Sequence, residues 1–218
     1  MKKVILIGDS IRLGYDKFIR RSLSGIAEVY SPEENCRFAE YVLRYAHDWK
    51  IAGDWPSDAD IVHWNAGLWD ALRLFDDEPL TPVGAYGQYI KRIDKRLRQL
   101  FPKAKMIFAT NTSVNESGYG TGYAKYFKRF NSEIREYNSV AIDALKDTDT
   151  VIDDLYSVSE KATPVCRSDM THFNTEEGVR LIGGNVLRVI CEELKISLKD
   201  ITDKAEKPDE IDAKKLGY

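Results

Sequence analysis

The sequence holds few cysteines and no long apolar run, and both absences exclude whole classes of protein. Its three cysteines, Cys36, Cys166 and Cys191, are odd in number and widely spaced, with no CxxC pair for a zinc or redox site. We therefore expect a reducing, cytoplasmic environment. No stretch approaches the 18 apolar residues of a membrane span, and the first apolar run ends at Gly8, too early for a secretory signal.

An excess of charge of one sign is also lacking. The 32 basic and 35 acidic residues are well mixed and give a net charge of -3, so the chain has no basic surface for nucleic acid or for a membrane. With 218 residues it is long enough to bury a large core without disulfides or metals. We expect one domain over residues 1–198 and a charged tail over residues 199–218.

Strands and helices are predicted to alternate five times along the chain. The first strand contains four branched aliphatic residues, Val4 to Ile7, a pattern typical of a central strand buried on both faces. Further strands are expected at 27–30, 59–65, 104–110 and 150–155, and helices at 11–23, 36–49, 86–100, 123–145 and 175–194. This alternation predicts an α/β three-layer sandwich, with a five-stranded parallel sheet of flavodoxin-like order 2-1-3-4-5 and helices on both faces.

Ser10 follows the first strand and would lie at the carboxyl edge of the sheet, where ligands bind in such folds. A serine nucleophile needs a base, and the chain offers three histidines. His47 lies in an amphipathic helix and His63 inside a strand, so surface or core roles are expected for both. His172 follows the last strand, and Asp169, three residues earlier, can orient its imidazole. The sequence thus predicts a Ser10, Asp169, His172 triad.

An acyl-transfer site also needs donors for the oxyanion. The candidates are the N–H of Ser10, the side-chain amide of Asn65 and a backbone N–H near Cys36. Two alternatives stay open: Cys36 as the nucleophile, and a metal held by Asp169, His172 and His63, for which the ligand spacing gives no support. The sequence has no P-loop and no Gly-x-Gly-x-x-Gly after a strand, so no cofactor is expected.

Four segments together resemble the conserved blocks of the SGNH, or GDSL, hydrolase superfamily. They are Gly8-Asp9-Ser10, Glu34-Asn35-Cys36, Asn65-x-Gly67-x-x-Asp70 and Asp169-x-x-His172, in the family's order over about residues 1 to 195. The resemblance implies a flavodoxin-like sandwich and a serine esterase or acyl hydrolase that needs no metal. By position it makes Ser10 the nucleophile, His172 the base and Asp169 the orienting carboxylate.

The sequence departs from the family's pattern in two blocks. Cys36 stands nearest the place of the glycine whose N–H usually enters the oxyanion hole, and Trp69 replaces the usual oxyanion asparagine. The resemblance implies that Asn65, upstream of Trp69, supplies the amide instead, as an Asn-x-Gly-Leu-x-Asp sequence does in some carbohydrate-active branches.

The substrate is expected to be a small molecule or a glycan. Asn35, Trp64, Trp69 and Tyr119 are predicted to contact it, since aromatic faces beside amide groups suit a sugar ring, although either tryptophan could instead pack the core. The favoured reaction is removal of a short acyl group, most simply acetyl, from a carbohydrate ester. The alternative is a non-catalytic glycan- or protein-binding member of the same fold. The sequence does not determine the oligomeric state.

Overall fold

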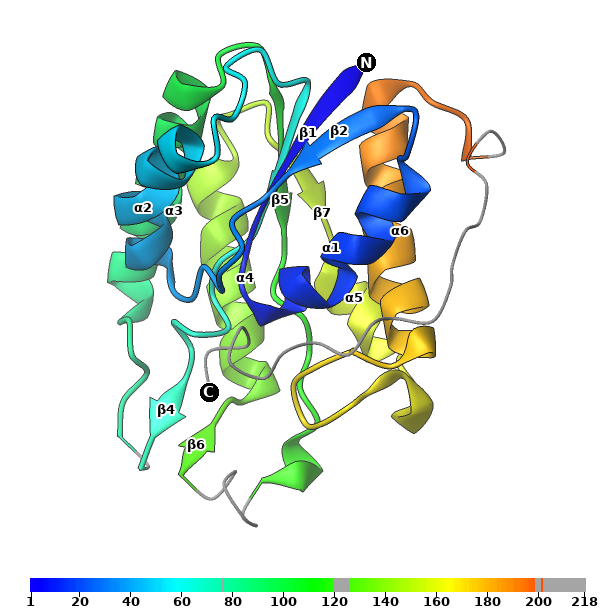
Figure 1. Cartoon of the computed structure of the whole chain (residues 1–218). Coiled ribbons are helices and arrows are strands. Elements are labelled where there is room, and N and C mark those ends of the chain that lie inside the picture. The colour runs from blue at the N-terminus through cyan, green and yellow to red at the C-terminus, as the bar shows by residue number, and fades with distance from the viewer. Residues whose placement is uncertain (76, 120–125, 199–200, 202–218) are drawn as a thin grey trace.

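The computed structural model describes residues 1–75, 77–119, 126–198 and 201, and its centre is a five-stranded parallel sheet (Figure 1). The strands lie in the order β2-β1-β3-β5-β7. They are β1 (Lys2–Ile7), β2 (Ala27–Tyr30), β3 (Ile61–Trp64), β5 (Lys105–Ala109) and β7 (Val151–Asp153). Numbered within this sheet alone, the order is 2-1-3-4-5, so the predicted fold is confirmed.

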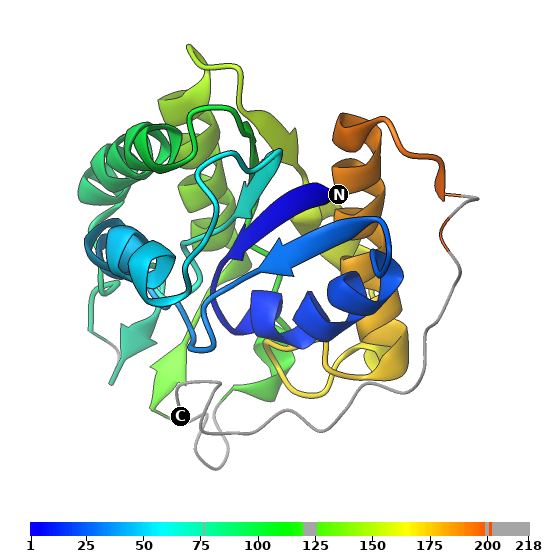
Figure 2. The same cartoon turned by 45° about the horizontal axis from the view of Figure 1, so that its top comes forward.

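Helices cover both faces of the sheet (Figure 2). One face carries α1 (Ser10–Ser22), α5 (Leu155–Glu160) and α6 (Glu176–Leu194), and the other carries α2 (Ala39–Ala52), α3 (Val83–Leu100) and α4 (Asn131–Leu145). Side chains of β1 alternate between the two layers: Val4 and Leu6 join the core beneath α1 and α6, while Ile5 and Ile7 join the core beneath α2 and α3. A central strand must be apolar on both faces for this reason.

The structure contains elements that were not predicted. β4 (Arg73–Leu74) and β6 (Phe127–Lys128) pair antiparallel in a separate two-stranded sheet, seen below the main sheet in Figure 1. The helix predicted from residue 123 begins at Asn131, because β6 occupies part of that segment; residues 120–125 lie outside the described residues. Short 3-10 helices span Glu116–Gly118 and Pro164–Cys166. Of the predicted tail, only Ile201 is described.

The parallel strands bring several loops to one edge of the sheet. The turns after β1, β2, β3 and β5 all leave from its carboxyl ends, and the segment between α5 and α6 returns to the same edge (Figure 1). Segments far apart in the sequence therefore meet there. Among the described helices, none has the length and apolar character needed to cross a membrane.

Candidate active site

Three side chains from distant parts of the chain form a hydrogen-bonded series at this edge. Ser10 is the first residue of α1, whose N-cap Asp9 accepts the N–H of Ile11 at 2.9 Å. The Ser10 Oγ lies 2.8 Å from Nε2 of His172, which is 162 residues later in the chain. Nδ1 of His172 lies 2.7 Å from Oδ2 of Asp169. A hydroxyl, an imidazole and a carboxylate are therefore aligned.

Asp169 is held in place by the backbone of its own loop. Its Oδ1 accepts the N–H groups of Thr171 at 2.7 Å and His172 at 2.8 Å, which leaves Oδ2 for the imidazole. Burial alone would raise the pKa of Asp169. The hydrogen bond and charge of His172, together with the two backbone N–H groups, outweigh this effect and lower the pKa to about 2. This carboxylate is ionised at neutral pH and fixes the tautomer and orientation of the ring.

The two ends of the series differ in their access to water. Ser10 is only 5% exposed and His172 is 0% exposed, whereas the side chain of Asp169 is 41% exposed. The hydroxyl is therefore sheltered, and the carboxylate faces solvent.

Asn65 lies against the turn that carries Ser10. A Cβ added at Gly8 would stand 2.0 Å from Oδ1 of Asn65, so a larger residue at Gly8 would displace the amide. Burial raises the pKa of Asp9, and the N–H of Ile11 and the nearby Asn65 amide oppose that rise. A carboxamide carries two N–H groups, which can donate to an acceptor in the site.

The N–H of Cys36, a predicted oxyanion donor, is engaged within the protein. It donates to the carbonyl of Gly8 at 3.1 Å, which argues against that role. The residue is fully buried, and burial raises the pKa of its thiol to about 11 despite the nearby Arg12. A buried, protonated thiol is a poor nucleophile, which also argues against Cys36 as the reactive group.

Arg12, which the sequence analysis did not single out, holds the Cys36 turn against the Ser10 turn. Its side chain is 1% exposed, with Nη1 3.0 Å from Oδ2 of Asp16. Nη2 donates to the carbonyl of Glu34 at 2.6 Å and more weakly to that of Gly8 at 3.4 Å. The buried charge is thus paired and hydrogen-bonded, and it joins two of the loops at the site.

Asp70 fastens the loop after β3 to the start of α2. Its Oδ2 accepts the N–H of Ala39 at 2.9 Å, in the first turn of that helix. Burial raises the pKa of Asp70 to about 7, even though hydrogen bonds from Thr81 and Ala39 oppose the rise. The loop that bears Asn65 is therefore anchored at its far end.

The four predicted substrate contacts fall in different environments. Trp64 is 0% exposed and packs against Phe108, with ring centroids 4.8 Å apart, so its predicted substrate contact is wrong: α2 and α3 cover that face of β3. Trp69 and Tyr119 are half-buried and come together in a small apolar cluster that also contains Leu72, Phe127 and Met170. Asn35 is buried, and its Oδ1 accepts the N–H of Arg37 at 2.8 Å.

Arg129 follows β6 and was also missed, because a single arginine after a two-residue strand gives no sequence signal. Its side chain is buried and its Nε donates to the carbonyl of Leu68, in the loop after β3. Arg129 forms no ion pair among the described residues, and Nη1 and the hydroxyl of the nearby Tyr119 are buried without a hydrogen-bond partner there. Such unpaired groups are typical of sites completed by water or ligand.

The remaining histidines lie elsewhere. His63 Nε2 is 3.0 Å from Oδ2 of Asp153 in the core, where Asn185 also donates to Asp153 at 2.6 Å. His47 is exposed beside Asp48 on α2. In the described part of the chain, no group of three or more histidine, cysteine or acidic side chains is arranged to hold a metal ion.

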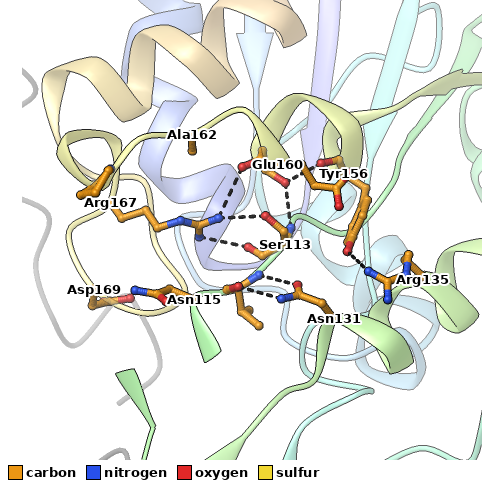
Figure 3. Close-up of a pocket in the computed structure, with 12 residues that line it drawn as sticks. Ser113, Asn115, Asn131, Arg135, Tyr156, Glu160, Ala162, Arg167 and Asp169 are labelled. Carbon is orange, nitrogen blue, oxygen red and sulfur yellow. Dashed lines mark hydrogen bonds between the residues drawn. The ribbon is translucent and has the colours of Figure 1, made fainter. Parts of the chain in front are cut away.

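A polar cavity of about 580 Å³ borders Asp169 (Figure 3). Its walls come from the loop after β5, from α4 and α5, and from the segment before His172. The lining residues are Ser113, Val114, Asn115, Asn131, Arg135, Tyr156, Ser159, Glu160, Ala162, Pro164, Arg167 and Asp169. Neither Ser10 nor His172 lines this cavity, so it adjoins the solvent-facing end of the hydrogen-bonded series.

Comparison with other proteins at the sequence level found nothing: no family model and no curated protein matches the chain. Comparison of structures found several esterases. The acetyl xylan esterase AlAXEase superposes with a TM-score of 0.65 at 15% identity, covering 86% of this chain and 99% of that one.

Two further structures give the same result. A carbohydrate esterase family 3 protein from Talaromyces cellulolyticus has a TM-score of 0.61 at 18% identity, covering 90% of this chain and 100% of its own. Axe2, an acetylxylan esterase from Geobacillus stearothermophilus, has a TM-score of 0.63 at 14% identity, covering 90% and 95%. This chain therefore shares its fold with these esterases.

Proposed function

We propose that this protein is a serine esterase of the SGNH type that removes a short acyl group, acetyl in the simplest case, from a carbohydrate. The observation that carries the proposal is the series of two short contacts, 2.8 Å from Ser10 Oγ to His172 Nε2 and 2.7 Å from His172 Nδ1 to Asp169 Oδ2. This is the arrangement in which a base can take the proton of a serine hydroxyl as it attacks a carbonyl carbon.

The proposed reaction proceeds through an acyl-enzyme. Oγ of Ser10 bonds to the ester carbon while Nε2 of His172 takes its proton, and the carbonyl electrons move to the oxygen. The N–H of Ser10 and an amide N–H of Asn65 are the proposed donors to that oxyanion. The intermediate expels the sugar alkoxide, which receives the proton from His172. A water molecule then attacks the acyl-enzyme while His172 takes its proton, and the Ser10 oxygen leaves with that proton as acetate is released. Asp169 stabilises the imidazolium during both acylation and deacylation.

Two observations support a carbohydrate ester. Several proteins that share this fold are named as acetyl xylan or carbohydrate esterases. In this chain, the half-buried rings of Trp69 and Tyr119 meet in one cluster beside the loops that carry Asn65 and His172. Aromatic rings near polar groups suit the alternating apolar and hydroxyl-bearing faces of a sugar.

Hydrolysis of 4-nitrophenyl acetate by the parent protein and by Ser10→Ala tests the proposal. We expect a loss of at least about 1,000-fold in kcat/KM, because removal of a nucleophile leaves only the residual effect of the oxyanion donors and of binding. Ser139→Ala, an exposed serine on α4, is the matched control and should keep the parent rate. Equal rates in the parent and Ser10→Ala would discard the esterase and favour a non-catalytic binding protein.

A further inference from the structure

The cavity beside Asp169 is built from fixed side chains (Figure 3). Arg167 donates to the carbonyl of Ser113 at 3.1 Å and to its hydroxyl at 2.8 Å. From α4, the side chain of Asn131 both accepts from and donates to the backbone of Val114, each at 2.9 Å. The walls are therefore set before any ligand arrives, which lowers the entropic cost of binding.

The charges around the cavity balance. Arg135 and Arg167 are positive, Glu160 and Asp169 are negative, and neither arginine forms an ion pair with another described residue. Burial lowers the pKa of Arg167. A cavity with this balance favours neither a lipid chain nor a strongly charged ligand. Donors and acceptors of both kinds instead suit a neutral molecule with many hydroxyl groups.

Two charged groups of the lining are exposed to such a ligand. They are Arg135, from α4, and Glu160, from α5. Arg135 uses Nη1 to donate to the hydroxyl of Tyr156 at 2.8 Å, and its remaining N–H groups have no partner among the described residues. A volume of about 580 Å³ lies within the usual range of small-ligand sites.

The cavity lies next to the three residues proposed to carry out the reaction. It is lined by Asp169, whose carboxylate contacts the imidazole that in turn contacts Ser10. The cavity thus lies two hydrogen bonds away from the Ser10 hydroxyl, on the Asp169 side of the imidazole.

We propose that this cavity is a binding subsite for the neutral sugar units beyond the acylated one, so that the substrate is an oligosaccharide or polysaccharide ester rather than an acylated monosaccharide. The inference rests on the proposed function. It assigns Arg135 and Glu160 to contacts with sugar hydroxyls on two walls of the subsite.

Chain-length dependence tests the proposal. We expect kcat/KM for mono-acetylated xylotetraose to exceed that for mono-acetylated methyl xyloside by at least about tenfold, mainly through a lower KM, since remote contacts contribute binding energy. Arg135→Ala and Glu160→Ala should each reduce this ratio at least about threefold. Arg188→Ala, which removes an exposed arginine paired with Glu192 on α6, is the matched control and should leave the ratio unchanged.

The two variants change the net charge in opposite directions. A long-range electrostatic effect would therefore move their ratios in opposite directions, whereas loss of hydroxyl contacts lowers both. Equal kcat/KM values for the two substrates, or ratios unaffected by both variants, would overturn the subsite.

Binding to Ser10→Ala separates this inference from the proposed function. Titration with xylotetraose that carries no acetyl group should show binding that Arg135→Ala weakens. If such binding occurs and the parent protein cleaves no ester, the esterase proposal fails and the subsite stands. If the parent cleaves both esters at equal rates and xylotetraose does not bind, the subsite fails and the esterase stands.

Discussion

The molecule contains two histidine–aspartate pairs, and they differ in what surrounds them. Nδ1 of His172 lies 2.7 Å from Oδ2 of Asp169 in a loop at the sheet edge. Nε2 of His63, on β3, lies 3.0 Å from Oδ2 of Asp153, on β7, and these two strands flank β5 in the sheet. Both members of the second pair are fully buried, and Nδ1 of His63 has no hydrogen-bond partner among the described residues. Nε2 of His172 instead contacts the hydroxyl of Ser10.

The difference shows that an imidazole and a carboxylate in contact do not by themselves make a site. The third group decides the role: a serine hydroxyl at the end of a strand gives His172 a proton to take, whereas the ring of Tyr15, edge-on at 6.2 Å, gives His63 only packing. We therefore propose that the first pair takes part in the reaction and that the second pair contributes to stability. Four predictions test that assignment.

The largest expected effect separates the two histidines. His172→Ala should lower kcat/KM for 4-nitrophenyl acetate by at least about 1,000-fold, because the serine loses its base. His63→Gln, the matched change in the core pair, should stay within about tenfold of the parent. Circular dichroism shows whether both variants are folded. A folded His63→Gln protein as inactive as His172→Ala would contradict the assignment.

The next effect concerns the carboxylate of the first pair. Asp169→Asn should lower kcat/KM by about 100- to 10,000-fold, since the amide favours the wrong tautomer of His172 and does not stabilise the imidazolium. The pKa of Asp169 is lowered to about 2, so this carboxylate does not titrate between pH 4 and 9. A kcat/KM of Asp169→Asn within about tenfold of the parent value would contradict this role of the carboxylate.

The effects on stability should be reversed, with a larger loss for the buried pair than for the pair at the sheet edge. Asp153→Ala removes one partner of a fully buried pair and leaves His63 and Asn185 without their acceptor, so we expect a loss of about 2–4 kcal/mol in the free energy of unfolding. Asp169→Ala should cost less than about 1 kcal/mol, because that side chain faces solvent. Urea unfolding measures both. A larger loss for Asp169→Ala would reverse the structural roles.

The smallest effect is on stability in acid. Because the pKa of Asp169 is about 2 in the folded protein and 3.8 in the reference state, its stabilisation is present above pH 4 and is lost as pH falls through 2. Asp169→Asn should therefore lose less stability than the parent between pH 4 and 2. The difference should be small because the side chain is partly exposed. Urea midpoints at the two pH values measure it, and identical losses would mean that the pKa of Asp169 is not lowered.

The sheet and the meeting of Ser10, Asp169 and His172 were predictable from the sequence. Four consecutive aliphatic residues specify a central strand, and strict alternation with helices specifies a parallel sheet, whose strands all present their carboxyl ends at one edge. Position along the chain then determines position in space for Ser10. The contact of His172 with Ser10 needed the additional pattern of Asp169-x-x-His172.

The structure argues against predictions for residues whose contacts leave no periodic pattern in the sequence. Cys36 was expected to direct its N–H at the oxyanion. Its N–H instead donates to the carbonyl of Gly8, which also accepts from Arg12, and a single buried arginine has no sequence signature. Trp64 was expected at the substrate because an aromatic face beside amide groups suits a sugar ring. The alternation of side chains along β3 instead points it, like Val62, into the core beneath α2 and α3. The β4–β6 sheet has two residues per strand, too few to show alternation.

The near-complete burial of Ser10 bears on covalent inhibitors. A phosphonate or sulfonate reagent must bring its electrophilic atom within bonding distance of a hydroxyl that is 5% exposed, beside an imidazole that is 0% exposed. With Ser10 as the nucleophile, entry of the reagent limits labelling more than the strength of the electrophile does. Labelling rates should accordingly fall as the cross-section of the reagent grows at constant leaving group, so a compact warhead is the reagent of choice for this serine.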